Sequence, residues 1–189
     1  MRKILFVDGS QGVGKSTLIS GISSRTPTLV HKFPFSEYSK TFSLSSNESL
    51  KGFQLGKDLA TLYFMGRSYY PQPYPQLVDR GPFSTAYYSL TTGRMTKPEV
   101  ELFLEAVSKM SEHFSFVFVR SVNQADFSRN KGDGFDHLKS TEVGQDEALE
   151  FMVNTAKKYK IPLKVFDNDF SVSIKNNVDR FYRLVKEEL

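Results

Sequence analysis

The stretch Asp8-Gly9-Ser10-Gln11-Gly12-Val13-Gly14-Lys15-Ser16-Thr17 lies between an apolar run at residues 4–7 and a second apolar pair at 18–19. It matches the phosphate-binding pattern G-x-x-x-x-G-K-[ST] at every fixed position, with a predicted strand before it and a predicted helix after it. Glycines at such positions adopt positive φ and let successive N–H groups converge on a phosphate. The helix that follows directs the positive end of its dipole to the same point. The pattern predicts a strand, a phosphate-binding loop and a helix; the alternative is a glycine-rich turn that binds nothing.

The same pattern assigns a role to each polar side chain of the loop. Lys15 would reach the β- and γ-phosphates of a nucleotide, and the Ser16 hydroxyl would be a ligand of Mg²⁺. The residues predicted to hold the donor nucleotide, expected to be ATP, are Gly9, Ser10, Gln11, Gly12, Val13, Gly14, Lys15, Ser16 and Thr17.

Length and composition exclude several kinds of site. A chain of 189 residues is long enough for one domain with a full core, and it contains no cysteine, which excludes disulfides, thiolate zinc sites and cysteine nucleophiles. The net charge of +4 suits anionic ligands. Its basic residues are spread along the chain, which favours a mixed solvated surface over a nucleic-acid-binding face. No apolar run is long enough for a membrane span, and we expect a soluble cytoplasmic protein with no signal peptide.

The order of predicted elements indicates the fold class. Strands are predicted at 3–8, 28–33, 77–80, 114–120 and 163–166. Helices are predicted at 15–25, 50–69, 83–90, after a capping box at 96–99, at 142–159 and at 171–187. This alternation predicts a three-layer α/β fold with a central parallel five-stranded sheet, in one domain of residues 1–189. Ligands bind at the carboxyl ends of such strands, where the phosphate loop, Pro34, Asp79 and Arg120 fall.

A second motif, Leu77-Val78-Asp79-Arg80-Gly81-Pro82-Phe83-Ser84-Thr85-Ala86-Tyr87-Tyr88, begins at the third predicted strand. Asp79, at the strand end, could hold a metal ion through water, and Arg80 is placed to neutralise phosphate charge. The alternative is a structural Asp-Arg pair that closes the strand.

With these two motifs, the sequence resembles the thymidylate kinases and the related deoxynucleoside kinases. Those enzymes carry an Asp-Arg pair at this strand end, followed by a Ser and an aromatic residue at the offsets of Ser84 and Tyr88. The pair Phe33-Pro34 ends the second strand as in that family. In the helix containing Leu62 to Arg67, the resemblance implies that Tyr63 stacks on the acceptor base and that Arg67, one turn later, hydrogen-bonds to it. The alternative for Tyr63 is a core aromatic residue.

The segment Asp126-Phe127-Ser128-Arg129-Asn130-Lys131-Gly132-Asp133 resembles the arginine-bearing lid of bacterial thymidylate kinases. We expect a short lid at about 123–141 that closes over the phosphates and excludes water, with Arg129 and Lys131 as its cations. A lid arginine is needed in that family when the phosphate loop has none, and the loop position here is Val13. The alternative is a solvated charged loop.

Three departures from the family pattern concern the acceptor more than the donor. The family usually grips the acceptor phosphate with an Arg at the position of Ser36, has an acidic residue at Gln11, and has Tyr at Gly81. Lys32 is the candidate replacement for the missing Arg.

The resemblance implies a kinase that moves the γ-phosphoryl group of ATP, with Mg²⁺, onto a deoxynucleoside monophosphate, first of all dTMP or a modified pyrimidine. It also implies a homodimer. The expected catalytic residues are Lys15, Arg80, Arg129 and Asp79, with Lys131 on ATP and Ser16 and Asp79 at the metal. The expected acceptor-binding residues are Lys32, Phe33, Pro34, Tyr63, Arg67, Arg80, Ser84 and Tyr88.

Three alternatives to this function remain open. One is a deoxynucleoside kinase, whose neutral 5′-hydroxyl acceptor benefits from a carboxylate base, for which Glu37 is the nearest candidate. The second is a kinase that acts on nucleic acid, which the basic composition supports weakly. The third is a nucleotide-binding regulatory ATPase with no small-molecule acceptor.

Overall fold

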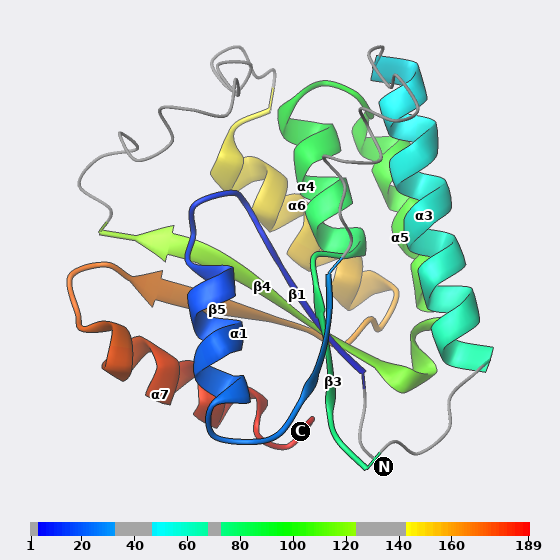
Figure 1. The fold of residues 1–189 in the computed structure, drawn as a ribbon. Coiled ribbons are helices and arrows are strands. Elements are labelled where there is room, and N and C mark those ends of the chain that lie inside the picture. Colours follow the sequence, from blue (N-terminus) through cyan, green and yellow to red (C-terminus); the bar gives the residue numbers. More distant parts are fainter. Residues whose placement is uncertain (1–3, 33–46, 68–72, 124–142) are drawn as a thin grey trace.

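A computed structural model describes residues 4–32, 47–67, 73–123 and 143–189; the side chains of Asn47 and Arg67 lie outside this description. A single sheet of five parallel strands, in the order β2-β3-β1-β4-β5, forms its centre (Figure 1). The predicted central parallel five-stranded sheet is confirmed. The strands are β1 (Ile4–Gly9), β2 (Leu29–Lys32), β3 (Gln76–Asp79), β4 (Phe114–Val122) and β5 (Leu163–Asp169).

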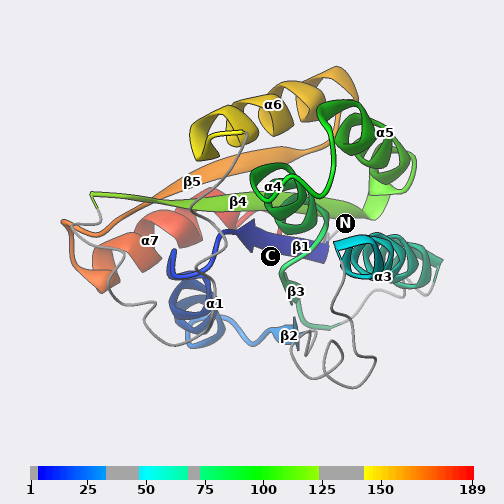
Figure 2. The same ribbon diagram turned by 90° about the horizontal axis from the view of Figure 1, so that it is seen from above.

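Helices cover both faces of the sheet, as Figure 2 shows from above. The helices are α1 (Lys15–Ser23), α3 (Asn47–Arg67), α4 (Pro82–Thr91), α5 (Lys97–Ser108), α6 (Gln145–Lys158) and α7 (Ile174–Val185), with a 3₁₀ turn, η1 (Ser111–His113), before β4. Side chains of α3, α4, α5 and α6 share one buried cluster, and those of α1 and α7 share another. The three-layer α/β architecture is therefore confirmed.

Strand β1 contributes to both clusters, because successive side chains of a strand point to opposite faces. Ile4 and Phe6 pack in the cluster on the α4 side, and Leu5 and Val7 pack in the cluster on the α1 side. All four side chains are buried. This continuous apolar run fixes β1 in the middle of the sheet and places its carboxyl end, where the phosphate loop begins, between β3 and β4.

Strands β4 and β5 extend beyond their predicted ends at 120 and 166, to Val122 and Asp169. The additional residues are polar except for Val122, so their composition resembles that of a loop. They remain in the ladder because the ends pair with each other, with Arg120 beside Asp167 and Val122 beside Asp169.

The structure confirms the predicted start of one helix, α5, and moves the start of another, α3. The capping box that begins α5 is confirmed: the Thr96 backbone N–H donates to Glu99 Oε2 at 2.8 Å. Helix α3 starts at Asn47, before the predicted residue 50, and continues through glycines whose added Cβ atoms would meet nothing within 4 Å, at Gly52 and Gly56. None of the described helices combines the length and apolar character that a membrane span requires.

Candidate functional site

The phosphate loop lies between β1 and α1, as predicted. Its glycines have positive φ, +139° at Gly9, +77° at Gly12 and +86° at Gly14, and α1 begins at the next residue. A Cβ atom at Gly9 would lie 2.3 Å from the carbonyl oxygen of Val119 on β4, a backbone atom that cannot move aside. Only glycine therefore fits at Gly9, and the positive φ at Gly12 and Gly14 favours glycine there. A loop of this kind before a helix N-terminus is suited to binding an anion.

Lys15 is the buried cation of this loop. Its Nζ donates to the carbonyl oxygens of Gly9, at 3.1 Å, and of Ser10, at 2.5 Å. Burial lowers the pKa of Lys15 to about 7, and the positive charge of Arg80 acts in the same direction, while the negative charges of Asp79 and Asp8 oppose the shift. Lys15, Arg80 and Asp79 therefore belong to one electrostatic site, although the two motifs lie more than 60 residues apart in the chain.

The Asp-Arg pair lies beside the phosphate loop at the end of β3. Asp79 is the last residue of β3 and pairs in register with Val7 of β1 and with Lys32 of β2. Arg80 follows with φ +73°, and its backbone N–H donates to the Val7 carbonyl at 3.0 Å. The pair thus stands at the carboxyl edge of three neighbouring strands, where the motif predicted it.

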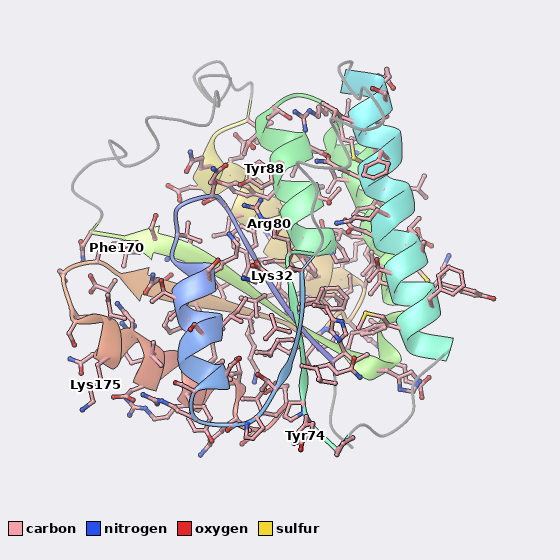
Figure 3. All side chains as sticks on the ribbon, viewed as in Figure 1. Lys32, Tyr74, Arg80, Tyr88, Phe170 and Lys175 are labelled. Carbon is pink, nitrogen blue, oxygen red and sulfur yellow. The ribbon has the colours of Figure 1, made fainter. Side chains whose placement is uncertain are left out.

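Three predicted site residues, Lys32, Arg80 and Tyr88, lie along this edge in Figure 3. One guanidinium nitrogen of Arg80 lies 3.5 Å from the Tyr88 hydroxyl, and its central carbon lies 5.7 Å from the centre of the Tyr88 ring. Lys32, at the end of the edge strand β2, is exposed. The structure therefore brings a cation from β2, a cation after β3 and an aromatic ring from α4 to one surface.

Ser84, predicted to contact the acceptor, lies beneath the phosphate loop. Its side chain is buried, and its Oγ accepts a hydrogen bond from the Gly9 N–H at 3.2 Å. The hydroxyl thus binds the donor loop directly.

Asp8, the residue before the loop, has a contact that sequence reasoning missed. Its Oδ1 accepts hydrogen bonds from the N–H groups of Gly81, at 2.7 Å, and Ser84, at 2.8 Å. Burial raises the pKa of this carboxyl to about 6, against the hydrogen bonds, which lower it. The only signal in the sequence was a carboxylate at the end of an apolar strand.

Asn168 is a second residue that the sequence did not single out. It lies near the end of β5, is buried, and donates from Nδ2 to the Val13 carbonyl at 2.8 Å. This hydrogen bond links the phosphate loop to β5, whereas Ser84 links it to α4.

Tyr63, predicted to stack on the acceptor base, is not a core residue: 47% of it is exposed, and its ring lies 5.5 Å from that of Phe64. Helix α3 is held against α4 by a buried carboxylate, since the Thr85 hydroxyl donates to Asp58 Oδ2 at 2.5 Å.

Several predicted residues lie outside the description: Phe33, Pro34, Ser36, Glu37, Arg129, Lys131, the side chain of Arg67, and the proposed lid except Asn123.

The donor set fits a nucleotide-bound magnesium ion better than a metal cage made by the protein. Within residues 4–32, 47–67, 73–123 and 143–189, no three His, Cys, Asp or Glu side chains converge as metal ligands. Magnesium in kinases is held by one or two side chains together with substrate phosphates. The exposed Ser16 hydroxyl and the Asp79 carboxylate fit that arrangement.

Comparisons in sequence identify no relatives: no family model and no curated protein matches the chain. Similar solved structures exist. A thymidylate kinase from Candida albicans superposes with a TM-score of 0.60 at 16% identity, covering 98% of this chain and 92% of that one. A thymidylate kinase from Ehrlichia chaffeensis gives 0.58 at 13% identity, covering 98% of each chain.

Two further structures show how broadly the fold is shared. The YorR protein from Bacillus subtilis, in complex with phosphorylated GDP, superposes with a TM-score of 0.56 at 16% identity, covering 98% of this chain and 96% of that one. A shikimate kinase from Bacteroides thetaiotaomicron gives 0.52 at 14% identity, covering 98% and 99%. These likenesses agree with the strand order and the phosphate loop: the chain has the P-loop kinase fold, the fold of the thymidylate kinases that its motifs resemble.

Proposed function

We propose that this protein is an ATP-dependent, Mg²⁺-assisted kinase that phosphorylates a deoxynucleoside monophosphate, with dTMP or a modified pyrimidine nucleotide as the first candidate acceptor. The observation that carries the proposal is the convergence of Lys15 and Arg80. Lys15 is buried inside the phosphate loop, and Arg80 follows β3, where its backbone N–H donates to the Val7 carbonyl two residues before that loop. After burial, the charge of Arg80 is the next cause that lowers the pKa of Lys15.

Two adjacent cations at a phosphate loop suit phosphoryl transfer because the reaction needs positioning and charge neutralisation more than covalent help. Backbone N–H groups of residues 10–16 would hold the β-phosphate, and Lys15 would exchange its bonds to the Gly9 and Ser10 carbonyls for bonds to phosphate oxygens. Magnesium held through Ser16 and Asp79 would neutralise charge on the β- and γ-phosphates.

An oxygen of the acceptor phosphate would attack the γ-phosphorus, the bond from the γ-phosphorus to the β–γ bridging oxygen would break, and ADP would leave. Such an acceptor is already an oxyanion and needs no general base. Arg80 would stabilise charge on the transferred group, with Arg129 and Lys131 as the proposed lid cations. Lys32, next to Asp79 in register, would bind the acceptor phosphate in place of the missing Arg.

The base and sugar of the acceptor would lie between α3 and α4. Tyr88 lies beside Arg80, and Tyr63 exposes nearly half of its surface; aromatic rings of this kind can stack on a base. The resemblance further suggests Arg67 on the base and a homodimer as the assembly.

The test is phosphoryl transfer from ATP to a panel that contains each deoxynucleoside, each deoxynucleoside monophosphate and a short DNA oligomer. We expect transfer to a pyrimidine monophosphate and its loss in Lys15→Ala. Lys164→Ala is the matched control, because Lys164 binds Glu188 and the Leu184 carbonyl near the chain end and should leave transfer intact.

Each other outcome points to a named alternative. Transfer only to nucleosides would contradict the monophosphate acceptor and make Glu37 the next residue to change. Transfer only to DNA, with a steep salt dependence, would indicate a nucleic-acid kinase. ATP hydrolysis that no acceptor stimulates would favour a regulatory ATPase.

A further inference from the structure

The backbone around Arg80 is tied to β1 at two successive positions. The Arg80 N–H donates to the Val7 carbonyl at 3.0 Å, and the Gly81 N–H donates to Asp8 Oδ1 at 2.7 Å. Between these bonds Arg80 has φ +73°, a left-handed conformation that a residue with a Cβ adopts only when its surroundings impose it. Arg80 is thus placed by contacts with the strand that leads into the phosphate loop.

The Asp8 carboxylate also performs the work of a helix cap. Helix α4 has no cap from its own N-terminal residue, Gly81, and the Ser84 N–H in its first turn donates to Asp8 Oδ1 at 2.8 Å. A carboxylate accepting N–H groups at this end of a helix also interacts favourably with the helix dipole. One oxygen of Asp8 therefore fixes both the residue after Arg80 and the start of α4.

This carboxylate is buried at a cost, which argues for a specific task. Asp8 is 0% exposed, and within the described part of the chain its Oδ2 has no hydrogen-bond partner. A buried charged group with one unsatisfied oxygen is less favourable than an apolar residue of similar size. The loss of hydration that makes this burial costly also raises the pKa of the carboxyl to about 6.

We propose that Asp8 is a positioning residue of the transfer reaction. It holds the 80–84 segment on the end of β1 and thereby keeps the Arg80 guanidinium in place relative to Lys15. The inference rests on the proposed function, because it assigns Asp8 an effect on catalysis through Arg80. Asp8 itself would not touch either substrate.

A double-mutant cycle tests this dependence. In the protein that retains Arg80, Asp8→Ala should lower kcat by at least about tenfold. In the Arg80→Ala variant, the same change should lower kcat by less than about threefold, because the effects of residues that act through one another are not additive. The KM for ATP should change little. Asn168→Ala, which instead removes the hydrogen bond to the Val13 carbonyl, is the matched control, and its kcat factor should be the same in both backgrounds.

Asp8→Asn separates the hydrogen bonds from the charge. Its Oδ1 can still accept from Gly81 and Ser84, so kcat should recover most of what Asp8→Ala loses. If Asp8→Asn lowers kcat as much as Asp8→Ala does, charge rather than placement is responsible and the proposal is wrong. Equal kcat factors for Asp8→Ala in the two backgrounds would contradict it equally.

A measurement without turnover distinguishes this inference from the proposed function. Amide hydrogen exchange of the whole protein should be faster at Gly81 and Ser84 in Asp8→Ala and near wild type in Asp8→Asn. The Leu18 amide, bonded to the Gly14 carbonyl, serves as the internal reference. Unchanged exchange at both positions would overturn the role of Asp8, whereas a wild-type protein that transfers no phosphoryl group would contradict the proposed function alone.

Discussion

The side-chain amide of Asn168 donates to the carbonyl oxygen of Val13 at 2.8 Å, which joins the end of β5 to the phosphate loop across 155 residues of sequence. The same Nδ2 would lie 2.5 Å from a Cβ atom added at Gly14, the next loop residue. Asn168 therefore occupies the space that glycine leaves beside the loop. It also gives a loop carbonyl its hydrogen-bond partner.

Asn168→Ala should weaken ATP binding, because the Val13 carbonyl loses its partner and the loop gains freedom. We expect the KM for ATP to rise about three- to tenfold, the effect of losing roughly one neutral hydrogen bond. Thr91→Ala is the matched control, since that buried hydroxyl donates to the Tyr87 carbonyl at 2.9 Å, within the last turns of α4. It should lower stability without changing the KM for ATP. An unchanged KM in Asn168→Ala would show that the loop holds its shape without this contact.

Gly81→Ala should destabilise the fold, because the added Cβ would lie 2.3 Å from Cδ1 of Phe6. Phe6 cannot easily move, since its ring lies 5.5 Å from that of Phe114 and 5.3 Å from that of Phe116. We expect a loss of about 1–3 kcal/mol in the free energy of unfolding, measured with denaturant.

Gly56→Ala provides the opposite expectation for the same chemical change. Gly56 lies exposed within α3, and an added Cβ would meet nothing within 4 Å. Removing the flexibility of glycine from a helix interior should raise the free energy of unfolding by about 0.5–1 kcal/mol. If both alanine variants shifted stability in the same direction, the contact with Phe6 would not be the cause of the loss at Gly81.

The buried Asp8 carboxyl predicts a pH-dependent difference in stability between wild type and Asp8→Asn. Burial raises its pKa from 3.8 to about 6, so the folded state binds the proton more tightly than the unfolded state. The stability that this protonation contributes is complete below pH 3.8 and is lost as the pH rises through about 6. Asparagine does not titrate.

Relative to wild type, Asp8→Asn should therefore gain stability between pH 4 and pH 8, by on the order of 1–3 kcal/mol. Urea unfolding of both proteins at the two pH values measures it. Two other buried groups are coupled to Asp8 by charge, Asp58, whose carboxyl pKa is also raised, and Lys15, whose pKa is about 7, so the measured difference includes the change in their titration. A difference independent of pH would mean that Asp8 titrates alike in the folded and unfolded states.

The sequence predicted the parts of the site that are local in the chain. The phosphate loop is one uninterrupted segment whose glycines, lysine and serine lie within eight residues, and the Asp-Arg pair stands at the end of its strand. The roles of Asp8 and Asn168 were not predicted because their hydrogen-bond partners are distant in sequence. The N–H groups that donate to Asp8 belong to residues 73 and 76 positions away. No periodicity or spacing signals a pairing of that kind.

The departure at Gly81 has a structural explanation that the sequence alone did not provide. The family that the sequence resembles usually has Tyr at this position. Here the ring of Phe6 occupies the space that a side chain would need, so only glycine fits after Arg80. Strands β4 and β5 were predicted to end too early for a related reason: the contact that keeps their polar ends in the sheet joins residues that are distant in sequence. Arg120 binds both carboxylate oxygens of Asp167, at 2.5 and 3.2 Å, which lets charged residues continue the ladder.

Tyr88 should matter through its ring more than through its hydroxyl. The hydroxyl lies 3.5 Å from the Arg80 guanidinium, at the limit of a hydrogen bond, whereas the guanidinium carbon lies 5.7 Å from the ring centre, within the range of a cation–π contact. Tyr88→Phe keeps the ring, and we expect kcat and the acceptor KM to change by less than about threefold. Tyr88→Leu removes the ring and should reduce kcat/KM for the acceptor by about tenfold or more, as both the placement of Arg80 and the acceptor surface are lost.

Tyr87→Phe is the control for these two variants, because Tyr87 is the adjacent residue but packs in the core beside Phe118, 5.2 Å from ring to ring. Its kinetic constants for ATP and acceptor should remain those of the wild type. If Tyr88→Phe proved as damaging as Tyr88→Leu, the hydroxyl rather than the ring would be the functional group. That group would then be expected to bond to the acceptor itself, since its contact with Arg80 is too long to account for such a loss.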